Sequence, residues 1–106
     1  MLQHQLPKKY LQIKERHEKL FHAVDTLGTV AKQEGPLDEK TAQLIQLAAA
    51  ASIKSEGSVH SHARRAIEGG ATPEEIYHAI ILLTSTIGFP SVVAALSWAD
   101  DVLGEL

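Results

Sequence analysis

The stretch Ser55-Glu-Gly-Ser-Val-His-Ser-His-Ala-Arg-Arg-Ala-Ile-Glu-Gly-Gly-Ala-Thr-Pro-Glu-Glu75 decides how this chain folds. It predicts a short helix over about residues 58–69 that ends at a glycine pair, because glycine readily takes the left-handed conformation common at helix ends. A second helix follows at once. Thr72 suits its N-cap, Pro73 its first position, and Glu75 its third, where it completes a capping box. The sequence therefore predicts two helices joined by a tight junction.

Polar side chains gather on one face of the first of these helices. Ser55, Ser58 and His62 are spaced i, i+3 and i+7, so a helix carries all three on the same side. A serine and a histidine one turn apart could act as nucleophile and general base if a third group fixed the imidazole tautomer. The sequence offers no candidate for that third group. We interpret this face as a candidate active site.

The segments before this stretch are also predicted to be helical. Apolar residues recur at spacings of three and four from Pro7 to Gly35-Pro36, which predicts one amphipathic helix there. Asp38 is a suitable N-cap for the next helix. We expect that helix to end near residues 55–57, where Gly57 favours a break.

The segments after it complete an all-α fold. The segment from Ile76 is apolar on nearly all sides, which indicates burial on two sides. Gly88-Phe89-Pro90 turns the chain into a last helix. No alternating strand pattern is found. We therefore predict an all-α, single-domain bundle of about five helices, spanning residues 1–106.

Length and composition limit the classes of protein to consider. The chain has 106 residues, which is enough for one domain with one core but small for a stable monomer. Its net charge is -3 and it has no basic stripe, so nucleic acid is not an expected partner. Without a long unbroken apolar run or an apolar leader, we expect no membrane association and a cytoplasmic location. With no cysteine, disulfides and thiol chemistry are excluded.

The order of these motifs resembles the carboxymuconolactone decarboxylase family, which includes the alkylhydroperoxidase-D-like proteins. The peroxidase branch has the pattern Cys-x-x-Cys-x-x-x-His, then a Gly-Ala-Thr-x-Glu-Glu-Ile junction. Here the histidine is His62, the junction is Gly70-Ala71-Thr72-Pro73-Glu74-Glu75-Ile76, and both cysteine positions hold serine. The resemblance covers about residues 35–103. It implies an alkylhydroperoxidase-D-like bundle that assembles as a trimer or hexamer.

Two departures from the family pattern argue against peroxidase chemistry. A serine hydroxyl has no accessible redox couple and does not ionise near neutral pH, so Ser55 and Ser58 cannot replace a redox pair of cysteines. The resemblance also places a proton-relay glutamate about twelve residues before the first cysteine, and that position is Gln43 here. An amide cannot relay a proton in the same way.

Acid/base chemistry by His62 is the first hypothesis, because unperturbed histidine titrates near neutral pH. The decarboxylase branch, which this chain resembles through Val59-His60-x-His62, removes carbon dioxide from a small acidic lactone without a metal. The arginine that usually precedes this element is Ser58 here, which leaves the substrate open. The expected catalytic residues are His62, Ser58 and Ser55. The expected substrate contacts are Arg64, whose guanidinium can bind a carboxylate, His60 and Gln43.

Other functions remain open at this stage. The chain could be a non-catalytic oligomeric binding protein that has lost the redox cysteine pair, or an alkylhydroperoxidase-like antioxidant, which the absence of cysteine disfavours. We expect no cofactor and no metal. His60 and His62 are two residues apart and lie on different faces of a helix, which argues against a shared ion. We expect a homo-oligomer, because the helix from Ile76 is apolar on two sides.

Overall fold

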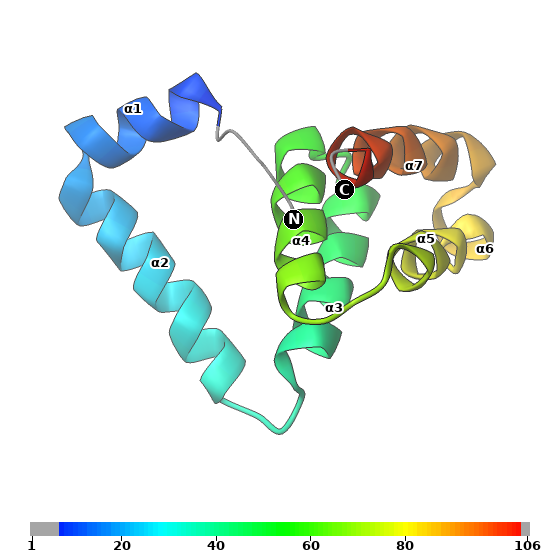
Figure 1. The fold of residues 1–106 in the computed structure, drawn as a ribbon, viewed down its shortest axis with the longest axis horizontal. Helices are drawn as coiled ribbons and strands as arrows, with labels where there is room; N and C mark the ends of the chain where they lie inside the picture. The colour runs from blue at the N-terminus through cyan, green and yellow to red at the C-terminus, as the bar shows by residue number, and fades with distance from the viewer. Residues whose placement is uncertain (1–6, 105–106) are drawn as a thin grey trace. The chain divides into compact units, whose positions relative to one another are not determined.

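A computed structural model describes residues 7–104, and every regular element in that range is a helix (Figure 1). The helices are α1 (Lys8–Arg16), α2 (Glu18–Gln33), α3 (Glu39–Ser52), α4 (Glu56–Glu68), α5 (Pro73–Ile81), α6 (Thr84–Ile87) and α7 (Phe89–Leu103). The all-α prediction is confirmed. The chain divides into two compact units, one holding α1 and α2 and the other holding α3–α7. None of the described helices is long and apolar enough to cross a membrane.

Two helix starts are fixed by the residues that the sequence indicated. The Asp38 carboxylate accepts a hydrogen bond from the Thr41 backbone N–H at 2.8 Å and caps α3. At α5, the Thr72 hydroxyl accepts from the Glu75 N–H at 3.1 Å, and the Glu75 carboxylate accepts from the Thr72 N–H at 2.9 Å. Pro73 takes the first helical position. The predicted capping box is confirmed, because it depends only on residues within one turn.

α4 ends at the predicted glycine pair. Gly70 has a φ of +101°, the left-handed conformation, whereas Gly69 does not. The Ala71 N–H donates to the Ala66 carbonyl at 2.8 Å, and the Gly70 N–H donates to the Ile67 carbonyl at 3.0 Å. This pair of bonds satisfies the last carbonyls of the helix.

α3 ends in the same way but without glycine. Lys54 has a φ of +58°, while the Ser55 N–H donates to the Ala50 carbonyl at 3.0 Å and the Lys54 N–H donates to the Ala51 carbonyl at 3.1 Å. The expectation that Gly57 breaks this helix was wrong, since Gly57 lies inside α4. The two carbonyl bonds compensate the cost of a left-handed lysine.

The core lies between α3, α4, α5 and α7 and is rich in small side chains. α3 and α4 pack together over most of their length, and α7 packs on α4 (Figure 1). Alanines at their contacts allow the backbones to approach closely. The buried apolar residues are Leu47, Ala50, Ala51, Val59, Ala63, Ala66, Ala71, Ile76, Ile80, Val92, Ala95, Ala99, Val102 and Leu103. Gln43 is the one buried polar residue among those described.

The prediction of a single helix in the first segment was wrong, because this segment forms two helices, α1 and α2. His17 leaves the helical conformation, with φ −129° and ψ 57°, and separates α1 from α2. The bend brings the Phe21 ring against the Tyr10 ring, with centroids 5.3 Å apart. The same two residues would lie about 16 Å apart along a straight helix. No glycine or proline marks this bend, so the sequence pattern could not predict it.

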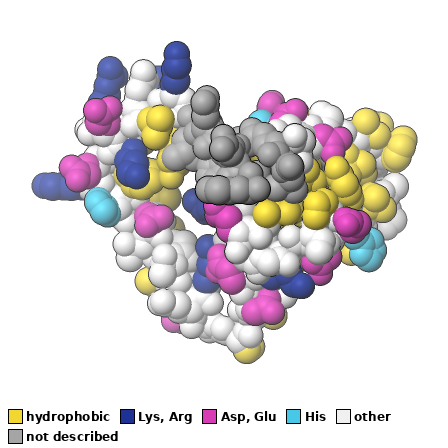
Figure 2. Space-filling view, viewed as in Figure 1, with side chains coloured by type: hydrophobic (Ala, Val, Ile, Leu, Met, Phe, Trp, Pro, Cys, Tyr) yellow, Lys and Arg dark blue, Asp and Glu magenta, His cyan; other side chains and the backbone are white. Residues whose placement is uncertain are grey.

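The segment from Ile76 also divides, into α5 and the short α6. Ile76 and Ile80 are buried, as predicted for the inner face. On the outside, Ile81 is 50% exposed and Leu82 is 63% exposed. Figure 2 shows apolar side chains gathered over this part of the molecule. On α7, Phe89 is 64% exposed and Val93 is 46% exposed, and we call Ile81, Leu82, Phe89 and Val93 the outer apolar face.

Candidate functional site

The candidate site is a chain of three hydrogen-bonded side chains between α3 and α4. His62 Nδ1 lies 2.8 Å from Gln43 Oε1. Gln43 Nε2 donates to Glu39 Oε1 at 3.0 Å. The Gln43 side chain is fully buried, while Glu39 is exposed and His62 is half-buried. A buried amide bonded at both ends has a fixed orientation, since an unbonded buried polar group would be costly.

The fold places these residues through helical spacing and helix packing. Glu39 and Gln43 are four residues apart and therefore share one face of α3. His62 lies on the face of α4 that packs against α3. Gly69, at the end of α4, brings its backbone close to the first turn of α3: a Cβ there would lie 3.3 Å from Glu39 Cγ and 3.5 Å from the Lys40 backbone nitrogen. The close approach of the two helices holds all three side chains together.

The two serines lie in the first turn of α4, beside the site. Ser55 takes the N-cap position, yet its side chain makes no capping hydrogen bond. Ser58 is half-buried and lies one turn before His62 on the same face. Neither hydroxyl takes part in the chain from His62 to Glu39. Their predicted catalytic role stays a prediction.

His60 is turned away from His62, as two residues of helix require. Its Nε2 lies 3.0 Å from Asp101 Oδ2 on α7 and 4.0 Å from Glu56 Oε2 one turn earlier on α4. The donor atoms of this trio lie within 4.8 Å of one another, which a metal ion could bridge. The 3.0 Å contact is already explained by a hydrogen bond between His60 and Asp101 that ties α4 to α7.

Arg64 is half-buried on α4 and, like His60, is offset by two residues from His62. The structure therefore brings together Gln43 and His62 from the predicted set, with Ser58 nearby. It places His60 and Arg64 away from the face that carries His62. Their predicted contacts with substrate are expectations that a bound ligand would have to test.

An apolar groove of about 380 Å³ lies between α3 and α5. Its lining residues are Thr41, Leu44, Ile45, Ala48, Glu75, His78, Ala79, Leu82 and Leu83. At its rim, Lys40 Nζ donates to Glu75 Oε2 at 3.0 Å. The backbone hydrogen bond from Thr72, followed by the Lys40 ammonium, lowers the pKa of the Glu75 carboxyl. His62 is not among the lining residues, so this groove is separate from the candidate site.

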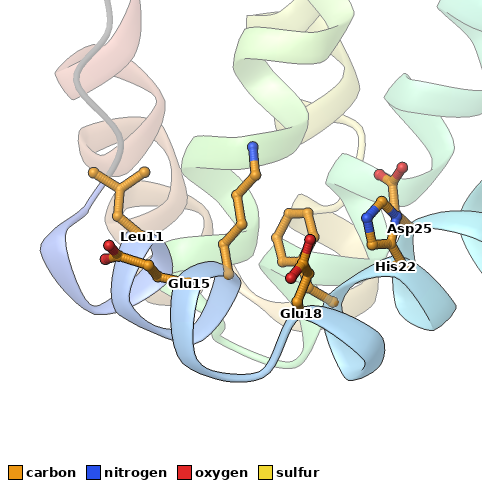
Figure 3. A pocket seen from close by; sticks show the side chains of 7 residues that line it. Leu11, Glu15, Glu18, His22 and Asp25 are labelled. Carbon is orange, nitrogen blue, oxygen red and sulfur yellow. The ribbon is translucent and has the colours of Figure 1, made fainter.

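A second hollow, of about 680 Å³, lies within the α1–α2 unit (Figure 3). Its labelled residues are Leu11, Glu15, Glu18, His22 and Asp25. Lys14 Nζ lies 5.4 Å from the Phe21 ring centroid, in a cation–π arrangement. Neither α1 nor α2 has a buried residue, so this hollow is a surface feature of two helices without a buried core of their own.

Comparison with known proteins identifies the class of protein. The family model described as the Carboxymuconolactone decarboxylase family matches residues 18–101. The chain belongs to this family. The matched region begins earlier than the resemblance expected from residue 35, and includes α2. The family assignment therefore rests on most of the chain.

One similar solved structure is described as apo-lpg0406, a carboxymuconolactone decarboxylase family protein from Legionella pneumophila. It is 24% identical, with a TM-score of 0.73 over 89% of this chain and 87% of that one. This likeness supports the fold. No curated protein matches the chain.

Sequence reasoning did not find Glu39, although it named Gln43 and His62. The available signal was the i, i+4 spacing of Glu39 and Gln43 at the start of a helix. That spacing is common on helix surfaces. It gained meaning only when the tertiary structure placed His62 at the other end of the Gln43 amide.

Proposed function

We propose that this chain is a small acid/base enzyme in which His62 moves a proton on a small acidic, lactone-like substrate. The observation that carries the proposal is the 2.8 Å contact between His62 Nδ1 and the fully buried Gln43 amide. A histidine used in catalysis needs a partner on one nitrogen to orient the ring and leave the other nitrogen for the reaction. Gln43 supplies that partner.

Membership of the family supports this choice of reaction. Loss of carbon dioxide from a carboxylate leaves the bonding electron pair on the adjoining carbon, and that carbon must then gain a proton. An imidazolium can donate such a proton to that carbon, and the neutral imidazole that results can take up another proton from water near neutral pH. The absence of cysteine removes the thiol route from consideration. A positioned imidazole needs no cofactor for a proton transfer of this kind.

The test is decarboxylation of carboxymuconolactone and related small acidic lactones, followed by release of carbon dioxide. We expect His62→Gln to lower kcat by about 10²–10⁴-fold, the usual contribution of a general acid or base. His78→Gln is the matched control, since His78 is an exposed histidine on α5. It is expected to retain wild-type turnover. Equal loss in both variants would refute a specific role for His62.

The binding-protein alternative makes a different prediction. If the wild-type chain binds acidic lactones but turns none of them over, the catalytic proposal is wrong and the chain is a binding protein. Peroxide with a dithiol reductant provides a further comparison. Sustained peroxide consumption would contradict the chemical argument from Ser55 and Ser58, because neither side chain can be oxidised and reduced in turn.

We also propose that the chain forms a homo-oligomer, a trimer or hexamer, through the outer apolar face. Ile81, Leu82, Phe89 and Val93 are each at least 46% exposed in a single chain. Ile81 and Leu82 lie at the end of α5, Phe89 and Val93 lie one turn apart on α7, and exposed large apolar side chains that gather in a patch usually meet a partner. Burying this patch against a second copy would remove it from water.

The oligomer proposal is tested by the molar mass in solution, measured by light scattering or sedimentation. We expect an oligomer for the wild type and a smaller species for Leu82→Glu, which places a charge in the patch. Ile53→Glu is the control, since Ile53 is a 76% exposed apolar residue at the end of α3, outside the patch. A monomeric wild type at all concentrations would refute the proposal.

A further inference from the structure

The hydrogen-bond chain Glu39–Gln43–His62 has a direction that is set at its carboxylate end. A carboxylate only accepts hydrogen bonds, whereas a glutamine amide has a donating NH₂ and an accepting oxygen. Glu39 Oε1 lies 3.0 Å from Gln43 Nε2, so the amide NH₂ must point toward Glu39. The amide oxygen then points in the other direction, toward α4.

This direction fixes the proton on the imidazole. Gln43 Oε1 accepts hydrogen bonds and lies 2.8 Å from His62 Nδ1, so Nδ1 must carry the hydrogen. In the neutral ring, Nε2 then holds the lone pair. The flipped amide would set its oxygen against the Glu39 carboxylate, where two acceptors face each other and repel. The Glu39 carboxylate thus decides the tautomer of His62 by way of the Gln43 amide.

We propose that Glu39 is a positioning residue that, through the Gln43 amide, holds His62 in its Nδ1–H tautomer and makes Nε2 the atom that exchanges a proton with substrate. This inference rests on the proposed function only for its last part, the use of Nε2. The tautomer itself follows from the donor and acceptor order of the three side chains. Its chemical consequence is that substrate must approach the Nε2 side of the ring.

The packing around Glu39 keeps it in reach of Gln43. Glu39 is the first residue of α3, where a negative side chain is favoured by the helix dipole. Asp38 caps the same helix end and fixes where it starts. Gly69 lies against Glu39 Cγ from the α4 side. Burial of Gln43 excludes water as a competing partner for its amide.

A merely structural role for Glu39 would be support of the helix start. Charge-changing variants separate the two roles. Glu39→Gln offers both a donor and an acceptor and Glu39→Leu offers neither, so neither fixes the direction of the Gln43 amide, whereas Glu39→Lys offers only donors. A donor at position 39 favours the flipped Gln43 amide, whose NH₂ would then face His62 Nδ1. That arrangement requires an Nε2–H ring.

The experiment is ring nitrogen NMR of His62 at a pH where the ring is neutral, using two-bond proton–nitrogen correlation. We expect Nδ1–H in the wild type, a mixture of tautomers in Glu39→Gln and Glu39→Leu, and a shift toward Nε2–H in Glu39→Lys. Glu74→Lys is the control, since Glu74 is an exposed first-turn acid on α5. It should leave the His62 tautomer unchanged.

A wild type with Nε2–H, or Glu39 variants that all keep Nδ1–H, would overturn the proposal. Turnover provides the second readout. We expect Glu39→Lys to lose much of the wild-type kcat and Glu39→Gln to lose less, because a wrong histidine tautomer can cost about 10⁴ in kcat. If the tautomer changes as expected but turnover does not, the tautomer assignment stands and the use of Nε2 in catalysis is refuted.

Discussion

Gly69 at the end of α4 lies directly against Glu39 at the start of α3, so that a Cβ on Gly69 would come within 3.3 Å of Glu39 Cγ. The same Cβ would lie 3.3 Å from the Arg65 carbonyl oxygen. Such distances are tighter than ordinary van der Waals contact. This close approach links the end of one helix to the hydrogen-bond chain that begins at the start of another.

Gly69→Ala is therefore expected to displace the Glu39 side chain and shift the His62 ring signals. Its effect on the free energy of unfolding should be small, since the gain of about 0.4–1 kcal/mol from restricting the unfolded chain offsets the crowding. Gly57→Ala is the matched control, because Gly57 lies inside α4 and nothing lies within 4 Å of its Cβ position. It should stabilise by about 0.5–1 kcal/mol.

Urea unfolding measures both variants. An equal gain in stability for the two, together with unchanged His62 signals in Gly69→Ala, would show that the contact between Gly69 and Glu39 is not tight.

Two consecutive valines on α7 differ only in burial and provide a test of the core. Val92 is 1% exposed and Val93 is 46% exposed. Val92→Ala should lower the free energy of unfolding by about 2 kcal/mol, through lost transfer energy and the cavity left behind. Val93→Ala should cost clearly less in the isolated chain. Denaturant unfolding at low protein concentration compares them, and a similar cost for both would contradict the packing of α7.

Acid sensitivity should come in part from two helix-start carboxylates. Hydrogen bonds from the Thr41 side chain and backbone lower the pKa of Asp38, and the Thr72 backbone N–H and Lys40 lower that of Glu75. A carboxyl whose pKa is lower in the folded state stabilises the fold at every pH above its ordinary pKa, which is 3.8 for Asp38 and 4.5 for Glu75. That stabilisation is lost as the pH falls through the pKa of the folded state.

The double variant Asp38→Asn with Glu75→Gln should consequently show a flatter decline in stability below about pH 4.5. Asparagine remains a good N-cap, so the start of α3 should persist at neutral pH. Thermal unfolding across the acid range gives the slopes. Glu74→Gln, the same change beside the capping box, is expected to keep the wild-type slope. A double variant that follows the wild-type curve would disprove this source of acid sensitivity.

Lys54 holds a left-handed conformation that costs a residue with a Cβ about 1–2 kcal/mol. Lys54→Gly should raise the free energy of unfolding by up to about 1 kcal/mol, because glycine adopts this conformation without strain. The melting temperature should rise accordingly. Ile53→Gly tests whether position matters: Ile53 has a φ of −90°, so glycine offers no relief there. Stabilisation by Ile53→Gly but not by Lys54→Gly would contradict the geometry of this helix end.

The sequence predicted those features that are settled within a few residues. The capping box at Thr72 and Glu75, the Asp38 cap and the glycine end of α4 all depend on hydrogen bonds inside one or two turns. Local chemistry is enough for such features. The sequence could not predict the bend at His17, because the contact between Tyr10 and Phe21 exists only after the helix has bent.

From the sequence alone came an all-helical chain that resembles the carboxymuconolactone decarboxylase family, with His62 on a helix face and no cysteine for redox chemistry. Tertiary structure decided what His62 meets. Gln43 and His62 are 19 residues apart on separate helices, and only the rotation of α4 against α3 brings their polar ends to 2.8 Å. Spacing along a chain fixes the face of one helix, whereas the packing of two helices fixes which faces touch.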